Sequence, residues 1–486
     1  MSSEPEKRVR VRFAPSPTGY PHLGNIRTAL FNWLFARHYN GEFILRIEDT
    51  DVARRVEGAI EAILDSLQWL GLNWDEGPHF QSQRLPFYQE VANKLLKEDH
   101  AYLCYCSPEQ LEAMRQEQMG RKQPPKYDGR CRNLTQQERA RLEATGIIPV
   151  VRFKMPPEGE TTFHDLIRGS ITFRNDTLDD FVLLKSDGYP TYHLANVVDD
   201  HLMNISHVLR ADEWLSSTPR HALLYQALGW QPPEFAHLPM ILGTDRTKLS
   251  KRHGVAAINE YQKQGYLPNS MINFLALLGW SLDDRTELLN REELIEHFSL
   301  ERVSKAAAIF DKAKLEWMNG VYLRKLSPEE FVQRATPFLD EGLAPSVKRP
   351  LDSDYICQVM PLIQERARIL GEVPQLAHFF FVDELQYTTE LLLSQNIDAR
   401  TAIRAIEVTL QKLRAMEAWG TQHLEDTLRP LSTELDLSTG KFFGLLRVAI
   451  TGRTAAPPLF QTMAVLGKGK SLERLCTAQQ KLLQQY

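Results

Sequence analysis

The sequence is poor in the features that mark disulfide-bonded, secreted or membrane-spanning proteins. Only five cysteines occur in 486 residues, and such an odd, sparse set is a poor disulfide framework. No apolar run approaches the roughly 20 residues that a membrane-spanning helix needs. The first residues, MSSEPEKRVRVRF, lack the apolar stretch of a signal peptide. These absences predict a cytoplasmic protein with no membrane association.

Neither sign of charge dominates the chain. It carries 57 Lys and Arg against 62 Asp and Glu, a net charge of −5 at pH 7. That balance excludes a protein that holds nucleic acid through overall positive charge, although a local basic face could still bind it. Hydrophobic residues make up 43% of the chain, which is ample for several cores. At roughly 150 residues per domain, the length allows about three domains.

The residue pattern predicts a sheet that is split along the sequence. Residues 9–13 alternate as a strand does, a breaker-rich loop follows, and apolar spacing predicts a helix over 25–38 and a buried strand over 43–47. Further helices are expected around 56–70 and 214–228. Strand signals at 181–184, 205–209 and 238–242 are expected to form the second half of a parallel sheet. Beyond about residue 325 the pattern is almost wholly helical.

The predicted fold class is therefore α/β, with a Rossmann-like nucleotide-binding core split by a mixed α/β insert. A helical connector and an all-α C-terminal part follow it. The expected boundaries are 1–86 and 187–251 for the two halves of the core, 87–186 for the insert, 252–325 for the connector, and 326–380 and 381–486 for two helical subdomains.

The first segment that carries chemistry is 14–25, where the first strand passes into the first helix. Backbone amides at a helix N-terminus suit phosphate, Gly24 would let a ligand approach the backbone, and His22 can donate to a phosphate oxygen. The alternative is a Pro-rich turn with an exposed histidine.

The second segment is Lys248-Leu249-Ser250-Lys251-Arg252, which follows the last expected strand. Two lysines on a Gly-bounded loop can close over a triphosphate, and Lys251 could neutralise charge on the leaving pyrophosphate. A solvated basic loop is the alternative. The pair of segments is more specific than either one, because they stand at the first and last strands of the same expected sheet.

Together these segments resemble the HIGH and KMSKS signatures of class I aminoacyl-tRNA synthetases. PSPTGYPHLG at 15–24, LRIEDTD at 45–51, WDEGP at 74–78 and YHLANVVDDH at 192–201 resemble the bacterial-type glutamyl-tRNA synthetase family. Asn25 stands where the class signature has its second histidine, so His22 takes that role. The resemblance implies that the protein activates L-glutamate with ATP and transfers it to the 3′-terminal adenosine of tRNA(Glu). It also implies an anticodon-binding role for the helical part, an acceptor-binding role for the insert, a tRNA-stem contact for the connector, and a monomer.

The resemblance also implies the site residues. His22, Lys248 and Lys251 would be catalytic, with Mg2+ accompanying ATP. ATP would be bound by Ala14, Pro15, Ser16, Pro17, Thr18, Gly19, His22, Gly24, Lys248, Leu249, Ser250, Lys251 and Arg252. Glutamate would be bound by Arg12, Ala14, Ser16, Glu48, Tyr192, Asn196 and Arg210.

Glutamate itself requires such a set. Guanidinium forks are the best carboxylate receptors, and Arg12 and Arg210 end strands on the sheet edge where ligands of open α/β folds bind. Glu48 would accept the ammonium group. A guanidinium facing the NH2 of glutamine would oppose donors to donors, so selectivity would come from polarity. The alternatives are an exposed strand position for Arg12 and a surface acidic cluster for Glu48.

Three cysteines, Cys104, Cys106 and Cys131, resemble a zinc site of some family members. The histidine that would complete the set is replaced by Asn133, a poor fourth ligand, and Tyr127 is near but is an uncommon ligand for zinc. We expect three reduced thiols without zinc.

Two further segments bear on tRNA. Between residues 441 and 474 the sequence contains six basic residues and one acidic residue. This excess predicts an RNA-binding surface that includes Lys441 and Arg447. Around Arg368 the family can carry an arginine that screens the third anticodon base, and Gly371 stands where it would be. The resulting hypothesis is that tRNA(Gln) is charged as well as tRNA(Glu).

Two other functions stay open. Glutaminyl-tRNA synthetase is the nearest, but that family is known for β-barrels in its anticodon part, where this chain reads helical. The other is a catalytically silent nucleotide- or tRNA-binding regulator on the same scaffold, which would not need both phosphate segments.

Overall fold

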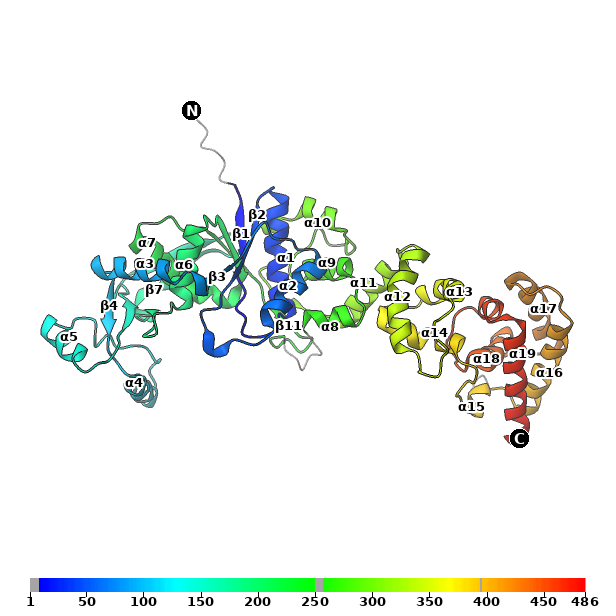
Figure 1. Cartoon of the computed structure of the whole chain (residues 1–486). Helices are drawn as coiled ribbons and strands as arrows, with labels where there is room; N and C mark the ends of the chain where they lie inside the picture. Colours follow the sequence, from blue (N-terminus) through cyan, green and yellow to red (C-terminus); the bar gives the residue numbers. More distant parts are fainter. Residues whose placement is uncertain (1–7, 250–256, 394–395, 486) are drawn as a thin grey trace, which may run out of the picture. The chain divides into compact units, whose positions relative to one another are not determined.

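The computed structural model describes residues 8–249, 257–393 and 396–485, and the chain forms two compact units (Figure 1). The first comprises residues 1–261 and 271–311, and the second comprises residues 262–270 and 312–486. In the described ranges we find no helix with the length and apolar character needed to cross a membrane.

The first unit opens with the predicted strand–helix–strand. Strands β1 (Arg10–Phe13), β2 (Glu42–Ile47) and β3 (Glu76–Phe80) form a parallel sheet in the order β1-β2-β3. Helices α1 (Leu23–His38) and α2 (Ala59–Leu70) connect them. The predicted elements over 9–13, 25–38, 43–47 and 56–70 are thus confirmed. β2 is buried on both faces, as expected of a parallel strand covered by helices.

A second sheet has the order β7-β6-β10-β9. Its strands are β6 (Glu160–Asp165), β7 (Gly169–Arg174), β9 (His207–Ala211) and β10 (Glu234–Leu238). β9 and β10 are parallel, and Ser206 N, just before β9, donates to Arg10 O of β1 at 2.9 Å. The two sheets therefore meet along β1 and β9, which brings the carboxyl ends of these strands together.

Two predicted strands differ from the structure. The run 181–184 contains β8 (Val182–Leu184), which pairs antiparallel with β5 (Val150–Phe153) beside β4 (Ala101–Cys104), so it is not part of the parallel sheet. The run 238–242 is interrupted because Pro239 has no N–H for a strand ladder. β10 ends at Leu238, and β11 (Ile241–Leu242) pairs with β12 (Ala308–Ile309) instead.

The remaining helices before residue 312 include the one that begins at Tyr192 and the one predicted near 214–228. They are α3 (Leu85–Lys97), α4 (Pro108–Gly120), α5 (Gln136–Glu143), α6 (Tyr192–Leu202), α7 (Thr218–Leu228), α8 (Ile258–Lys263), α9 (Pro268–Leu277) and α10 (Arg291–His297). A 3-10 helix over Asp212–Ser217 precedes α7, so the observed α-helix begins four residues after the predicted start at residue 214.

From residue 312 onward the regular elements of the described chain are all helical, which confirms that prediction (Figure 1). They are α11 (Lys312–Arg324), α12 (Pro328–Gly342), α13 (Ser353–Gln364), α14 (Val373–Phe381), α15 (Thr389–Leu392), α16 (Ala399–Ala415), α17 (Thr421–Glu434), α18 (Thr439–Thr451) and α19 (Leu459–Gln485), with a short 3-10 helix over Leu370–Glu372. Buried side chains from Phe331 to Leu482 belong to a single apolar cluster. The predicted six-part division of the chain stays a prediction.

Candidate active site

His22 closes the first turn of α1. It is the N-cap residue, and its Nδ1 accepts hydrogen bonds from the backbone N–H groups of Gly24 (3.1 Å) and Asn25 (3.3 Å). Because Nδ1 is an acceptor, the neutral ring carries its proton on Nε2, which remains a donor. Neighbouring groups shield part of the ring from water, which lowers the pKa of His22; Glu213 raises this pKa and Lys248 lowers it. His22 is exposed, as the alternative expected, but the cap fixes its orientation.

The structure shows a further reason for a glycine at position 24, beside the predicted one. A Cβ atom at this position would lie 3.0 Å from His22 Cε1 and 3.1 Å from His22 Nδ1. The glycine therefore leaves room for the capping imidazole, rather than for a ligand alone.

The loop over 14–19 is tied to the end of β2. Pro15 O accepts from Glu48 N at 3.0 Å, and Pro17 O accepts from Val56 N at 2.9 Å. Ser16 and Thr18 are exposed, and Ala14 and Gly19 are half-buried. The loop thus joins the predicted nucleotide residues to the predicted glutamate residue Glu48.

Lys248 lies in a turn that returns to β11. Leu249 N donates to Ile241 O at 3.2 Å, and Lys248 Nζ pairs with Glu213 Oε2 at 2.7 Å. Lys248 and Glu213 both shift the pKa of His22. Lys248 of the second predicted phosphate-binding segment therefore lies near His22 of the first. Ser250, Lys251 and Arg252 lie outside the described residues.

A buried cluster of charges lies behind this loop. Arg12 donates to both carboxylate oxygens of Asp200 (2.9 and 3.3 Å), and Arg46 pairs with Asp200 (2.8 Å) and Glu48 (3.2 Å). Asp199 accepts from Arg84 at 2.8 Å. Three guanidiniums thus face three carboxylates, and the cluster is neutral. Arg12 is 4% exposed and Glu48 7%, so the surface alternatives for both are wrong.

Glu48 is a carboxylate of this cluster whose ionised form is disfavoured by burial. Burial raises its pKa, against the opposite effect of Arg46 and Arg12. Asn196 lies beside it on α6, with its amide nitrogen on Asp200 Oδ2 (3.1 Å) and its oxygen on Arg46 Nη2 (3.2 Å). A cation beside Glu48 would stabilise the charged carboxylate.

Arg210 lies at the end of β9 and is 4% exposed. Its N–H groups meet Tyr192 Oη (2.9 Å), Thr218 Oγ1 (2.8 Å), His237 Nε2 (3.1 Å), His221 Nδ1 (3.3 Å) and Trp214 O (3.4 Å). Each of these described acceptors is neutral, so this buried cation has no direct counter-charge among them.

Arg12, Glu48, Tyr192, Asn196 and Arg210 lie in one region of the first unit. Burial raises the pKa of the Tyr192 phenol. The charges of Arg210 and Arg12 lower this pKa, and the charge of Glu48 raises it. Tyr192 also packs on Trp214 with ring centroids 4.3 Å apart. The structure therefore brings together residues that are almost 200 positions apart in the sequence.

Several residues of the site went unassigned in the sequence. Arg46 lies inside a buried strand, and Asp199 and Asp200 lie in the segment 192–201 with no predicted role of their own. A charged residue within an apolar run was the available signal for Arg46. His221 and His237 had no such signal, because their contacts depend on strand and helix partners.

The three cysteines come together with a fourth donor. The sulfur atoms of Cys104, Cys106 and Cys131 lie within 4.8 Å of one another. Tyr127 Oη lies 3.4 Å from Cys104 Sγ and 3.8 Å from Cys106 Sγ, and Cys106 Sγ lies 3.6 Å from Cys131 Sγ. A tetrahedral zinc with Zn–S bonds of about 2.3 Å would separate its sulfur ligands by about 3.8 Å. Tyr127 Oη is thus an oxygen that lies beside two of the three thiols.

The basic run over 441–474 is not a continuous surface. Arg474 is 3% exposed and donates to Ile450 O (2.7 Å) and Val382 O (2.9 Å). Lys468 donates to Arg414 O (3.0 Å) at the end of α16. Both cations satisfy helix-end carbonyls, so the predicted excess of charge facing RNA is too large. Lys441 and Arg447 are half-buried on α18.

Gly371 is explained by packing. A Cβ atom there would lie 2.8 Å from Gln264 O, and Gly371 N donates to the same oxygen at 3.1 Å. Arg368, nearby, pairs with Glu372 (2.9 Å) and Glu316 (3.2 Å). Packing thus accounts for a glycine at this position, and its link to the choice of tRNA stays a prediction.

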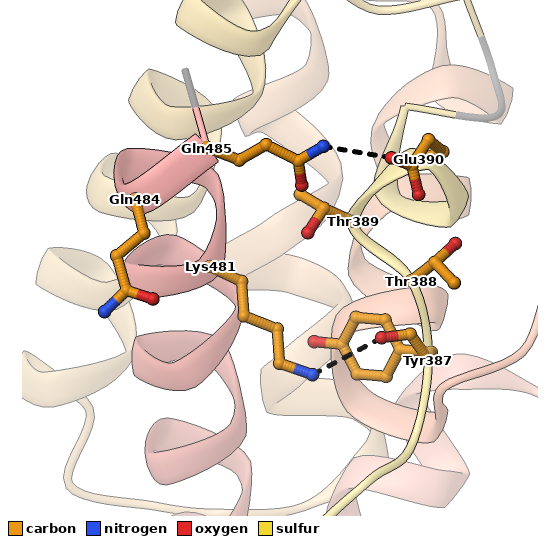
Figure 2. A pocket seen from close by; sticks show the side chains of 7 residues that line it. All are labelled: Tyr387, Thr388, Thr389, Glu390, Lys481, Gln484 and Gln485. Atoms are coloured by element: carbon orange, nitrogen blue, oxygen red, sulfur yellow. Dashed lines mark hydrogen bonds between the residues drawn. The ribbon is translucent and has the colours of Figure 1, made fainter.

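A shallow pocket lies in the second unit, between residues 387–390 and the end of α19 (Figure 2). Its two charged side chains already have partners: Lys481 Nζ lies 4.1 Å from the ring centroid of Tyr387, and Glu390 Oε1 accepts from Gln485 at 2.9 Å (Figure 2). It contains none of the predicted site residues, and we assign it no role.

Comparisons with known proteins agree with this arrangement. A family model described as tRNA synthetases class I (E and Q), catalytic domain, matches residues 8–317, and one described as an anticodon binding domain matches residues 330–479. The glutamate–tRNA ligase of Dehalococcoides mccartyi (strain CBDB1) is 55% identical over 480 residues, 97% of each chain. That of Roseiflexus castenholzii is 49% identical, over 96% of this chain and 95% of its own. The crystal structure of a glutamate tRNA ligase from Elizabethkingia meningosepticum in complex with its amino acid has a TM-score of 0.88 at 36% identity, over 98% of this chain and all of that one.

Proposed function

Because the chain belongs to the glutamate–tRNA ligase family of class I tRNA synthetases, we propose here which of its side chains bind the substrates of that reaction. The enzyme joins L-glutamate to tRNA(Glu) at the expense of ATP. The α-carboxylate of glutamate attacks the α-phosphorus of ATP, which forms glutamyl-adenylate and releases pyrophosphate. A ribose hydroxyl of the terminal adenosine, the 2′-OH by class resemblance, then attacks the activated carbonyl. Catalysis rests on positioning and electrostatics.

The observation that carries the glutamate assignment is the neutral surroundings of Arg210. A buried guanidinium whose described acceptors are all neutral is stabilised when a carboxylate enters beside it. Tyr192 Oη accepts from Arg210 at 2.9 Å and so can direct its own proton toward the same carboxylate. Glutamine would place an amide NH2 against these donors.

The other end of glutamate has matching partners. The ammonium group would lie beside Glu48, whose pKa is raised by burial, so that a nearby cation would stabilise its ionised form. Asn196 is buried within hydrogen-bond range of the same cluster. Arg12 would bind the second carboxylate of the substrate glutamate. Asp200 fixes the Arg12 side chain by accepting from its Nε and Nη2 groups. Ala14 and Ser16 stand on the loop that Glu48 N ties down.

ATP would bind at the N-terminus of α1. His22 would present its Nε2 donor to phosphate oxygens, because its Nδ1 already accepts from the backbone N–H groups of Gly24 and Asn25. Lys248 would exchange its contact with Glu213 for a phosphate. Lys251, with Ser250 and Arg252, completes the set by resemblance, and Mg2+ bound with ATP would offset part of the phosphate charge.

Pyrophosphate exchange into ATP tests this assignment. With glutamate and tRNA(Glu) present, the protein should catalyse exchange, and by resemblance it should need the tRNA. Arg210→Gln should raise KM for glutamate roughly 100-fold or more, because two charge-assisted bonds to the carboxylate are weakened. Arg8→Gln is the matched control, since that arginine is 65% exposed. No exchange in either condition would indicate the silent regulator instead.

We propose that Cys104, Cys106, Cys131 and Tyr127 hold one Zn2+, which revises the expectation from the sequence. Three of their separations, between 3.4 and 3.8 Å, are close to those of a tetrahedral ion's ligands, and the three sulfur atoms all lie within 4.8 Å of one another. Zinc here would join the segment around β4 to the loop at 127–131, and it would supply structure rather than chemistry to the reaction.

For tRNA, Lys441 and Arg447 remain the proposed contacts of the second unit. Reversing both charges should weaken tRNA(Glu) binding and leave KM for ATP and glutamate unchanged; unchanged tRNA affinity would remove this assignment.

Charging of tRNA(Gln) is proposed on the sequence alone, and absence of glutamyl-tRNA(Gln) with purified tRNA(Gln) would reject it. A monomer is expected in light scattering.

A further inference from the structure

Behind Arg210 lies a buried carboxylate–imidazole pair. His237 Nδ1 lies 2.6 Å from Asp165 Oδ2, and both side chains are fully buried. Asp165 also accepts from the backbone N–H groups of His237 (3.0 Å), Ile167 (3.0 Å) and Arg168 (2.8 Å). These donors keep the carboxylate ionised and lower the pKa of Asp165 despite its burial. His237 Nδ1 must therefore carry the ring proton, because it faces an acceptor.

This tautomer aims a lone pair at Arg210. With its proton on Nδ1, His237 has an unprotonated Nε2, which accepts from Arg210 Nε at 3.1 Å. Thr218 Oγ1 lies 3.1 Å from the same nitrogen and accepts from Arg210 Nη2 at 2.8 Å. Burial lowers the pKa of His237, so the ring stays neutral. The guanidinium is thus held along one edge by neutral groups.

Strand register creates this line of contacts. In the parallel pair of β9 and β10, His237 is the direct partner of Arg210, and β6, which ends at Asp165, lies on the other side of β10. Asp165, His237 and Arg210 therefore stand on three neighbouring strands. Asp165 comes from the segment predicted as an insert, which ties that segment to the glutamate site.

We propose that Asp165 and His237 are positioning residues that make Arg210 selective for a carboxylate. This inference rests on the proposed binding of glutamate by Arg210. A carboxylate in direct contact with Arg210 would hold the side chain equally well, but it would cancel the positive charge that distinguishes glutamate from glutamine. The neutral imidazole between Asp165 and Arg210 holds the guanidinium in place and leaves its charge for the substrate.

His221 acts from the other side in the same way. Its Nδ1 accepts from Arg210 Nη1 at 3.3 Å, so its proton lies on Nε2, which faces His193 Nδ1 at 3.1 Å. Burial lowers the pKa of His221 far below its ordinary value and that of His193 to about 4. Both rings are therefore neutral, and Arg210 remains the only cation among these contacts of the described chain.

The experiment compares variants of the full-length enzyme in pyrophosphate exchange with tRNA(Glu). His237→Leu removes the acceptor and should raise KM for glutamate roughly 10- to 100-fold, the effect of losing one bond to a charged group. KM for ATP should change less than about threefold, since the ATP residues are untouched. His237→Gln offers an amide oxygen to Arg210 Nε and should restore most of the glutamate affinity. A smaller preference for glutamate over glutamine should accompany the loss in His237→Leu.

Several outcomes would overturn the proposal. Equal KM for glutamate in His237→Leu and the parent would do so, as would equal losses in His237→Leu and His237→Gln. If His237→Leu fails to fold, Thr218→Val tests the same support with little change of shape, and an unchanged KM for glutamate would overturn it. Arg210→Gln separates a failure of the proposed glutamate site from a failure of the positioning role of Asp165 and His237. If it leaves KM for glutamate unchanged, the proposed glutamate site fails; if it raises KM while the His237 and Thr218 variants do not, only this inference fails.

Discussion

The role of Gly24 can be tested by adding one methyl group. In Gly24→Ala the new Cβ would lie 3.0 Å from His22 Cε1 and 3.1 Å from Nδ1, which is too close for the ring to stay where it is. The ring is held by bonds of 3.1 and 3.3 Å from the backbone, so a shift of a few tenths of an ångström weakens both. The Nε2 atom, which we assign to ATP phosphate, moves with it.

The expected effect falls on activity rather than stability. A weakened N-cap costs about 1 kcal/mol, and replacing a helical glycine by alanine contributes about 0.5 to 1 kcal/mol in the other direction. The melting temperature should therefore hardly change. A bond from His22 to phosphate contributes about 1.5 to 3 kcal/mol, and its partial loss of about 1 to 2 kcal/mol lowers kcat/KM for ATP roughly 5- to 30-fold.

Pyrophosphate exchange at saturating glutamate measures this effect. Gly120→Ala is the control, because that glycine is helical and has open space around its α-carbon. The decisive measurement is the double variant His22→Ala/Gly24→Ala. If Gly24 acts through the imidazole, the double variant should equal His22→Ala alone. If Gly24→Ala slows the His22→Ala enzyme by the same factor as the parent, the methyl group obstructs ATP itself, and our reasoning is refuted in favour of the sequence-based role.

Three further predictions follow from the buried groups. Glu48→Gln should raise KM for glutamate roughly 10- to 100-fold by removing the acceptor of the ammonium group. Because burial raises the pKa of Glu48, the parent's KM for glutamate should also rise as the pH falls toward that pKa, and the same rise in the Glu48→Gln enzyme would contradict this. Gly371→Ala should lower the free energy of unfolding of the second unit by about 1 to 3 kcal/mol in urea, because its Cβ meets Gln264 O, whereas Gly440→Ala, in open space, should not lower it. Elemental analysis should find one zinc per chain, and Tyr127→Phe should release it to a chelator at lower concentration; a metal-free parent protein would refute the four-donor site.

Local features of the sequence predicted a large part of the fold. The alternation before Pro15, the breaker-rich loop and the apolar spacing that follows each depend on neighbours a few residues away, and the structure places β1, the loop and α1 where they indicate. Helical periodicity after residue 325 was equally local. Strand partners were not, because an apolar run such as 181–184 has the same pattern whether it pairs with β5 or with the parallel sheet.

The candidate site divides in the same way. Arg12, Glu48 and Arg210 could be proposed from the ends of strands, yet their burial and their partners could not. Asp200, which holds Arg12, is 188 positions away from it, and no local pattern connects the two. The basic run at 441–474 shows the opposite error: counting charge included Arg474, which the helix packing buries.

What the sparse cysteines, balanced charge and short motifs determined was the class of protein and the order of its elements. Those properties depend on composition and on spacings of one or two helical turns, which a chain carries before it folds. The tertiary structure decided which charges are compensated. It left Arg210 among neutral acceptors, placed His237 and Asp165 behind it, and brought Tyr127 to three thiols. Electrostatic free energy depends on distance and burial, and both arise only when distant segments pack together.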